Sequence, residues 1–317
     1  MKKVIDLINE SEHTAFSFEI LPPLRGNSIQ KVYNVIDKLR EFDPKYINIT
    51  AHHSEYIYKS MPDGSFQKVN VRKRPGSVAI ASAIQNKYGI PAVPHIICKG
   101  FTKDETEYAL IDLNFLGVYN LLLLRGDIKT LEVEQKPEMY HDHATDLQQQ
   151  VNRFNEGFLL DGSRMEGIET PFSYGMACYP EKHEEAPNMD SDIFYLKEKV
   201  RNGADYLVTQ MFFDNAKYFA FVERCRAEGI TIPIIPGIKP IVFRNQLTVL
   251  PRVFRSDIPE PFAAELRKCK TDDEAKEVGI EWAIQQCKEL IAYGVPSLHF
   301  YTMMASESVR RIAKEIY

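Results

Sequence analysis

Charged side chains stand directly beside apolar runs at two places in the chain. Glu19 interrupts one such run, and four leucines at positions 121–124 lead straight into Arg125-Gly126-Asp127. A carboxylate in apolar surroundings needs a partner or a raised pKa, and such groups gather at functional sites. The charged triplet has an equally good structural reading as a turn with a solvated charge pair. Glu19 is therefore the stronger candidate for a group whose protonation is tuned by its surroundings.

Eight short apolar segments must position these residues, and a helical pattern follows each of them. The predicted strands are residues 15–20, 46–50, 92–97, 121–124, 173–178, 206–210, 232–235 and 297–300. Strict alternation of strand and helix predicts a parallel sheet, and eight such units in one domain predict a closed (β/α)8 barrel, the TIM barrel. A doubly wound sheet is the structural alternative. No Gly-x-Gly-x-x-Gly motif follows any of the strands, so the usual dinucleotide-binding motif is absent.

The barrel is expected to fill the chain as a single domain, residues 1–317. A short amphipathic lead-in helix should precede it, with insertions after strands 4 and 7. Ser28 and either Asp190 or Asp192 are expected to cap helices, and Thr102 with Glu105 forms a capping box. The polar segment around residues 63–64 is predicted to be a mobile loop.

Composition narrows the class of protein. The net charge of the 317 residues is -5, which argues against a nucleic-acid-binding surface. No apolar run reaches the roughly 20 residues that span a bilayer, and Asp6 interrupts a start too short for a signal peptide. Five scattered cysteines without a Cys-x-x-Cys pair are typical of a reducing compartment. We expect a cytoplasmic protein with neither nucleic-acid nor membrane partners.

Polar residues cluster where the predicted strands end, and the carboxyl ends of barrel strands carry the chemistry of this fold. These residues are Glu19, Thr50, His95, Arg125 with Asp127, Tyr179, Gln210 and Tyr301. His95 taken alone is more often a structural histidine. Together they predict one site at the carboxyl-end face.

No metal site is expected, because the histidines at 52–53 and 141–143 fall in predicted loops and the cysteines are scattered. A phosphate could bind the free backbone N–H groups of the helix near Asp192, with Lys199 and Arg201 in its next turns. Taken alone, that charge run is more often a solvated helix face.

Eight collinear motifs resemble the methylenetetrahydrofolate reductase family in its bacterial, catalytic-domain-only form. They run from about residue 15 to residue 302 and cover nearly the whole chain. The motifs are Phe18-Glu19 with Pro22-Pro23, Pro94-His95, Leu124-Arg125-Gly126-Asp127, Lys136-Pro137-Glu138-Met139-Tyr140, Tyr179-Pro180-Glu181, Thr209-Gln210-x-Phe212-Phe213-Asp214, Ile235-Pro236-Gly237-Ile238 and His299-Phe300-Tyr301-Thr302.

The resemblance implies a barrel that holds FAD and reduces 5,10-methylenetetrahydrofolate to 5-methyltetrahydrofolate for methionine synthesis. NADH or NADPH would supply the hydride in a ping-pong reaction. Glu19 would be the general acid that helps open the imidazolidine ring to an iminium, and Asp127 would shape flavin electrostatics and substrate binding. The substrate-binding positions would be Gln210 and Gln246. The flavin-binding positions would be Thr50, His95, Arg125, Gly126, Asp127, Tyr140, His141, Tyr179, His183, Ala186, Asp192 and Lys199.

Two departures from the family pattern leave donor preference and folate affinity open. Met303-Met304-Ala305 stands where many relatives have Leu-Asn-Arg, and Leu250 stands where an aromatic residue is frequent. The first alternative function is a metal-dependent barrel hydrolase that uses His52, His95 or His183 with Asp127. The second is a non-catalytic module that binds a partner. A homo-oligomer formed through the outer helices is expected.

Overall fold

A nine-stranded parallel sheet forms the centre of the molecule. The computed structural model describes residues 1–126, 137–166, 168–303 and 306–317. Along the sheet the order is β10-β11-β1-β2-β5-β6-β7-β8-β9. The strands are β1 (Ala15–Ile20), β2 (Tyr46–Ile49), β5 (Ala92–Ile97), β6 (Asn120–Leu124), β7 (Ser173–Cys178), β8 (Tyr206–Thr209), β9 (Ile234–Ile235), β10 (Gly237–Ile238) and β11 (Ser297–Tyr301).

The two ends of this sheet belong to one chain segment, which nearly closes it into a barrel. β9 pairs with β8, and β10 pairs with β11. Pro236 separates them, because a proline has no N–H to donate to a ladder, although its carbonyl still accepts from the His299 backbone N–H at 3.1 Å. The predicted seventh strand, residues 232–235, contains β9, and the structure continues it beyond Pro236 as β10. The predicted (β/α)8 barrel is confirmed.

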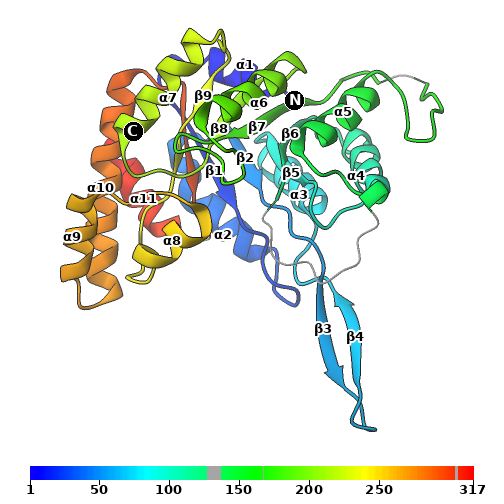
Figure 1. The fold of residues 1–317 in the computed structure, drawn as a ribbon, viewed down its shortest axis with the longest axis horizontal. Helices are drawn as coiled ribbons and strands as arrows, with labels where there is room; N and C mark the ends of the chain where they lie inside the picture. Colours follow the sequence, from blue (N-terminus) through cyan, green and yellow to red (C-terminus); the bar gives the residue numbers. More distant parts are fainter. Residues whose placement is uncertain (127–136, 167, 304–305) are drawn as a thin grey trace.

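Helices surround the sheet (Figure 1). In α2 the buried residues Val32, Val35, Ile36 and Leu39 lie on one face, as the helical spacing predicts. The helices are α1 (Val4–Asn9), α2 (Gln30–Leu39), α3 (Ser77–Tyr88), α4 (Lys103–Phe115), α5 (Ala144–Asn155), α6 (Met189–Arg201), α7 (Asn215–Ala227), α8 (Gln246–Phe254), α9 (Glu260–Lys268), α10 (Asp272–Tyr293) and α11 (Ser306–Ile316), with short 3₁₀ turns at Arg40–Phe42 and Pro137–Met139.

The lead-in helix α1 packs against the interior of the barrel. Val4 and Ile8 join a buried cluster with Tyr46 and Tyr206. At the first residue of β6, the Oδ1 atom of Asn120 accepts from the Val4 backbone N–H at 2.9 Å. The helix therefore covers the amino-terminal end of the barrel, and the opposite end is left for a site.

One expectation about the loops is wrong. The segment predicted to be a mobile loop is a hairpin of β3 (Glu55–Ser60) and β4 (Phe66–Val71), which projects from the barrel (Figure 1). Gly64 turns it with a φ of 81°, and the Met61 N–H donates to the Ser65 carbonyl at 2.8 Å. An Asp-Gly pair between two β-prone runs is a hairpin signal, and it was outweighed by the polarity of the segment.

Of the capping predictions for α4 and α6, the first is confirmed and the second is wrong. The capping box of Thr102 and Glu105 is confirmed. Asp190 and Asp192 do not cap α6, because the side chain of Asn188 accepts from the Ser191 N–H at 2.9 Å. The helix therefore begins before either aspartate.

Ser28 bonds to the start of α2 but is not its N-cap residue, and one of the two predicted insertions lies within the described residues. Ser28 Oγ accepts from the Gln30 N–H at 3.1 Å, although the N-cap position of α2 is Ile29. The insertion after the seventh strand contains α8 and α9, whereas residues 127–136 after the fourth lie outside the described part. Across the described ranges, no helix has both the length and the apolar character that a bilayer crossing requires.

Candidate active site

Glu19 projects toward the barrel interior from the carboxyl end of β1. Phe16, Phe18 and Ile20 alternate with it and pack into the core between strands and helices. The Glu19 side chain is 10% exposed, and its Oε2 atom lies 3.6 Å from Nε2 of His95 on β5. The predicted buried carboxylate therefore exists, but Phe16, Phe18 and Ile20 face away from it, and its near neighbour is another predicted site residue.

His95 faces Glu19 as a neutral imidazole. Burial, followed by the neighbouring His299 and His52, lowers the pKa of His95 to about 3. The Nε2 atom is buried and has no hydrogen-bond partner within the part of the chain that is described. A buried ring nitrogen of this kind is either occupied by a ligand or costly to maintain.

Tyr301 lies next to Glu19 on the neighbouring strand β11. It is the register partner of Glu19 between β11 and β1, and its hydroxyl donates to the Thr209 carbonyl at 2.6 Å. Burial, followed by the charge of Glu19, raises the pKa of Tyr301 well above its usual value. The phenol crosses above Gly237, where a Cβ atom would lie 2.5 Å from its ring and from the Thr209 carbonyl oxygen. Glycine is therefore required at this position.

Arg125 and Gly126 follow β6, as predicted, and join two loops. Arg125 Nε donates to the Asp142 carbonyl at 3.2 Å, and the guanidinium forms an ion pair with Glu185. Gly126 has a φ of 86°, which favours glycine. Asp127 lies outside the described residues, so its predicted role stays a prediction.

The loop between β7 and α6 holds three more predicted residues. The Tyr179 and His183 rings meet edge to face, with centroids 4.7 Å apart. The His183 N–H donates to Asp192 Oδ2 at 2.8 Å, and the Ala186 N–H donates to the His183 carbonyl at 3.1 Å. Burial lowers the pKa of His183, whereas the charge of Asp192 opposes that shift. Asp192 therefore anchors this loop.

Lys199 on α6 contacts the strand that leads into the same loop. Its Nζ atom donates to the Ala177 carbonyl on β7 at 2.9 Å, and burial lowers the pKa of Lys199. The alternative of a solvated helix face therefore fails for Lys199. It holds for Arg201, whose exposed guanidinium pairs with Glu198 at 2.8 Å.

The remaining predicted residues near the rim have local partners. Thr50 Oγ1 lies 3.0 Å from His52 Nε2. His141 is buried, its Nε2 atom lies 2.5 Å from Gln150 Oε1 on α5, and burial lowers its pKa. Burial also raises the pKa of Tyr140.

The two predicted substrate-binding glutamines make contacts within their own loops. Gln210 Oε1 accepts from the Met211 N–H at 2.9 Å, just after β8. Gln246 Oε1 accepts from the N–H groups of Val242 and Phe243 at 2.7 and 3.1 Å and so holds the segment that leads into α8. Leu250 is buried in the cluster beneath that helix.

The family model of methylenetetrahydrofolate reductase matches residues 3–317. The chain belongs to the methylenetetrahydrofolate reductase family. Relatives include methylenetetrahydrofolate reductase 1 of Schizosaccharomyces pombe, 30% identical over 96% of this chain and 46% of that protein. The 5,10-methylenetetrahydrofolate reductase of Escherichia coli is 30% identical over 92% of this chain and 86% of that protein.

The match covers only part of some relatives, and a solved structure shares the fold. The chain spans about half the length of the first eukaryotic members of the methylenetetrahydrofolate reductase family that it matches, between 44% and 49%. Among solved structures, a protein of Clostridium thermocellum that binds two copies of 5-methyl-5,6,7,8-tetrahydrofolic acid has a TM-score of 0.57 and 13% identity, over 98% of this chain and 97% of that one. That likeness shows the fold alone.

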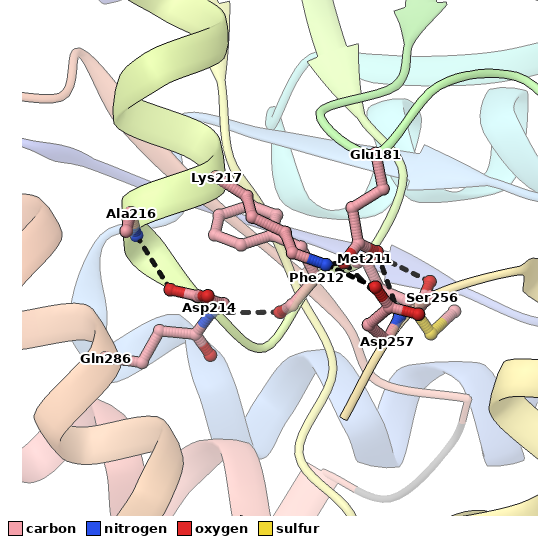
Figure 2. A network of polar contacts seen from close by, with 9 residues as sticks. All are labelled: Glu181, Met211, Phe212, Asp214, Ala216, Lys217, Ser256, Asp257 and Gln286. Carbon is pink, nitrogen blue, oxygen red and sulfur yellow. Dashed lines mark hydrogen bonds and ion pairs between the residues drawn. The ribbon is translucent and has the colours of Figure 1, made fainter. Parts of the chain in front are cut away.

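In this family member, a charged network connects the β7–α6 loop to neighbouring elements (Figure 2). Lys217 of α7 lies 2.7 Å from Glu181 and also pairs with Asp257, whose N–H donates to Glu181 at 3.1 Å. Burial raises the pKa of Glu181, and Lys217 opposes that shift. The loop bearing Tyr179 and His183 is thereby tied to α7 and to the chain after α8.

Sequence reasoning missed Lys239, which follows β10. Its side chain is buried, and burial lowers its pKa to about 8. The available signal was a lysine within the apolar run 234–242, which is the argument that selected Glu19. Within the described ranges, no group of three or more His, Cys, Asp and Glu could hold a metal ion.

Proposed function

We propose that this protein reduces 5,10-methylenetetrahydrofolate to 5-methyltetrahydrofolate, with NADH or NADPH as hydride donor and FAD as the carrier in a ping-pong reaction. The observation that carries the proposal is the buried Glu19 carboxyl beside neutral His95 at the carboxyl end of the barrel. Relatives named for NADH and for NADPH both occur, so the donor stays open. The product would supply methyl groups for methionine synthesis.

The residues around the rim fit FAD by their chemistry. The guanidinium of Arg125 suits a diphosphate, and Gly126 brings the backbone close without a side chain. The buried Nε2 atom of His95 has no partner in the described part of the chain and is available to a ligand. Thr50, Tyr140, His141, Tyr179, His183, Ala186, Asp192 and Lys199 would complete the site, with Asp127 shaping its electrostatics. FAD, when bound, carries hydride equivalents from the nicotinamide to the folate.

Glu19 would hold a proton at its carboxyl group and donate it to a ring nitrogen of the folate. That donation helps to open the imidazolidine ring to an iminium, which accepts hydride. Burial favours the protonated carboxyl, as a general acid near neutral pH requires. Gln210 and Gln246 would contact the folate, for which each must exchange its present local hydrogen bonds.

Anaerobic titration of the purified protein tests the proposal. NADH should bleach the flavin spectrum, and methylenetetrahydrofolate should then restore it with one methyltetrahydrofolate formed per flavin. A colourless protein with stoichiometric zinc would overturn the proposal in favour of a hydrolase. A flavin that NADH bleaches but that folate leaves reduced would overturn the substrate.

The setting of the enzyme also belongs to this proposal. We place it in the cytoplasm as a single-domain barrel that forms a homo-oligomer through its outer helices. The five cysteines, all free and buried, suit a reducing compartment. Sedimentation of the purified protein measures the oligomeric state.

A further inference from the structure

Lys239 lies in the same layer of the barrel as Glu19. Ile238 of β10 is the register partner of Phe300 on β11, which in turn is the partner of Phe18 on β1. One residue further along each strand are Lys239, Tyr301 and Glu19. Because alternate side chains of a barrel strand face the interior, these three side chains share one level at the carboxyl end.

The backbone that carries Lys239 is held firmly. Pro236 and Pro240 restrict its φ angles, and Gly237 packs under Tyr301. Beyond them, the Ile241 carbonyl approaches Gly279 of α10 so closely that a Cβ atom there would lie 1.9 Å from its oxygen. The backbone position from which the Lys239 side chain extends is therefore fixed.

Lys239 is buried, with 5% of the residue exposed. Within the described ranges it forms no hydrogen bond or ion pair, and Glu19 is the charged group that acts on it. A buried lysine without a paired anion is costly. The carboxylate form of Glu19 is the charge that stabilises the protonated lysine.

We propose that Lys239 is a positioning residue that acts on Glu19 through its charge, favouring the carboxylate form and so setting the highest pH at which Glu19 still carries the proton it donates. Burial of Glu19 has the opposite effect, because it favours the protonated, uncharged carboxyl group. A general acid works best when these tendencies nearly balance at the working pH. This inference rests on the proposed function, in which Glu19 is that acid.

Other titratable groups also face Glu19. His95 lies beside it from β5 and is neutral, since its pKa is about 3. Tyr301 approaches from β11 and keeps its proton, since burial raises its pKa well above the usual value. Burial lowers the pKa of Lys239 and Glu19 opposes that shift, with a net pKa of about 8. Lys239 is therefore the neighbour among these three that carries charge near neutral pH.

The test compares Lys239→Met, which removes the charge at similar length, with Lys239→Arg, which retains it. Infrared titration follows the carboxyl band of Glu19, assigned by its disappearance in Glu19→Gln. Lys239→Met should move the midpoint of that titration upward by about one pH unit or more, the usual effect of one nearby opposite charge. The alkaline limit of folate-dependent flavin reoxidation should move in the same direction, whereas Lys239→Arg should resemble the wild type.

Two outcomes overturn the inference: a Glu19 midpoint that is the same in Lys239→Met and wild type, or one that moves down. Should Lys239→Met not fold, the reciprocal measurement replaces it, because coupling between two sites is mutual. Glu19→Gln should then lower the pKa of Lys239 observed by ¹⁵N NMR of the amine, and an unchanged amine titration overturns the inference. The proposed function fails separately, if Glu19→Gln retains folate turnover, since the infrared midpoint does not depend on turnover.

Discussion

The Nε2 atom of His95 lies 3.6 Å from the Oε2 atom of Glu19, and the imidazole is uncharged because burial lowers the pKa of His95 to about 3. The His95 ring therefore contributes no positive charge beside this carboxyl group. A neutral neighbour leaves Glu19 free to keep a proton, whereas an imidazolium would favour the carboxylate. This relationship is the basis for assigning acid chemistry to Glu19.

Glu19→Gln should separate the two half-reactions. The amide has the shape of the acid but cannot donate a carboxyl proton, so folate-dependent reoxidation should fall by about 10²- to 10⁴-fold. Flavin binding and reduction by NADH should stay close to wild type. Stopped-flow absorbance measures each step separately. Equal loss in both steps would refute the acid role, because it would indicate damage to the flavin site.

Acid should destabilise the protein through its two buried neutral histidines. The pKa values of His95 and His299 are both about 3, lowered chiefly by burial, against 6.5 for an exposed histidine. Between these values the unfolded chain binds a proton that the folded chain does not. Their stabilising effect is therefore complete above pH 6.5 and declines as the pH falls, by about 1.4 kcal/mol per pH unit for each histidine.

Urea unfolding from pH 7 to pH 4.5 measures that slope. His299→Asn keeps a side-chain partner for Ser17, whose hydroxyl lies 2.9 Å from Nδ1 of His299. This variant should make the dependence of the unfolding free energy on pH shallower by the contribution of one histidine. A slope that is unchanged in this variant would show that His299 is protonated in the folded state.

Gly237→Ala should destabilise the barrel at its closing segment. The added Cβ would lie 2.5 Å from the Thr209 carbonyl oxygen and 2.5 Å from the Tyr301 ring, so the hydrogen bond between them must break. Overpacking of this kind costs about 1–3 kcal/mol. Gly76→Ala is the matched control, because the added atom there meets the flexible end of Arg72. Thermal unfolding that ranks the two variants equally would contradict the prediction.

Lys217→Met should loosen the β7–α6 loop and weaken flavin retention. It leaves the Glu181 carboxylate, whose side chain is 10% exposed, without the cation that lies 2.7 Å away. We expect about tenfold weaker FAD binding, equivalent to about 1.4 kcal/mol, measured by flavin fluorescence on dilution. Lys268→Met removes an exposed ion pair with Glu265 instead and should leave FAD binding unchanged. Weaker binding in both variants would point to a general effect of charge.

Much of the architecture could be read from the chain, because each strand and helix carries its own periodicity. Apolar runs such as 121–124 mark strands buried on both faces, and the order of the units specifies a barrel. Glu19 could also be found, since a carboxylate within an apolar run is a local conflict visible in one line of sequence. The hairpin β3–β4 was missed, because its polar strands bury little surface and resemble a loop.

Contacts between distant segments were decided only by the tertiary structure. No local pattern shows that Lys239 shares a layer with Glu19, since that depends on the register of β10 against β11 and of β11 against β1. The same holds for the local hydrogen bonds of Gln246 and for the hydrogen bond from Lys199 to the β7 backbone. Periodicity determines which face of an element is buried, whereas register and barrel closure determine which buried side chains meet.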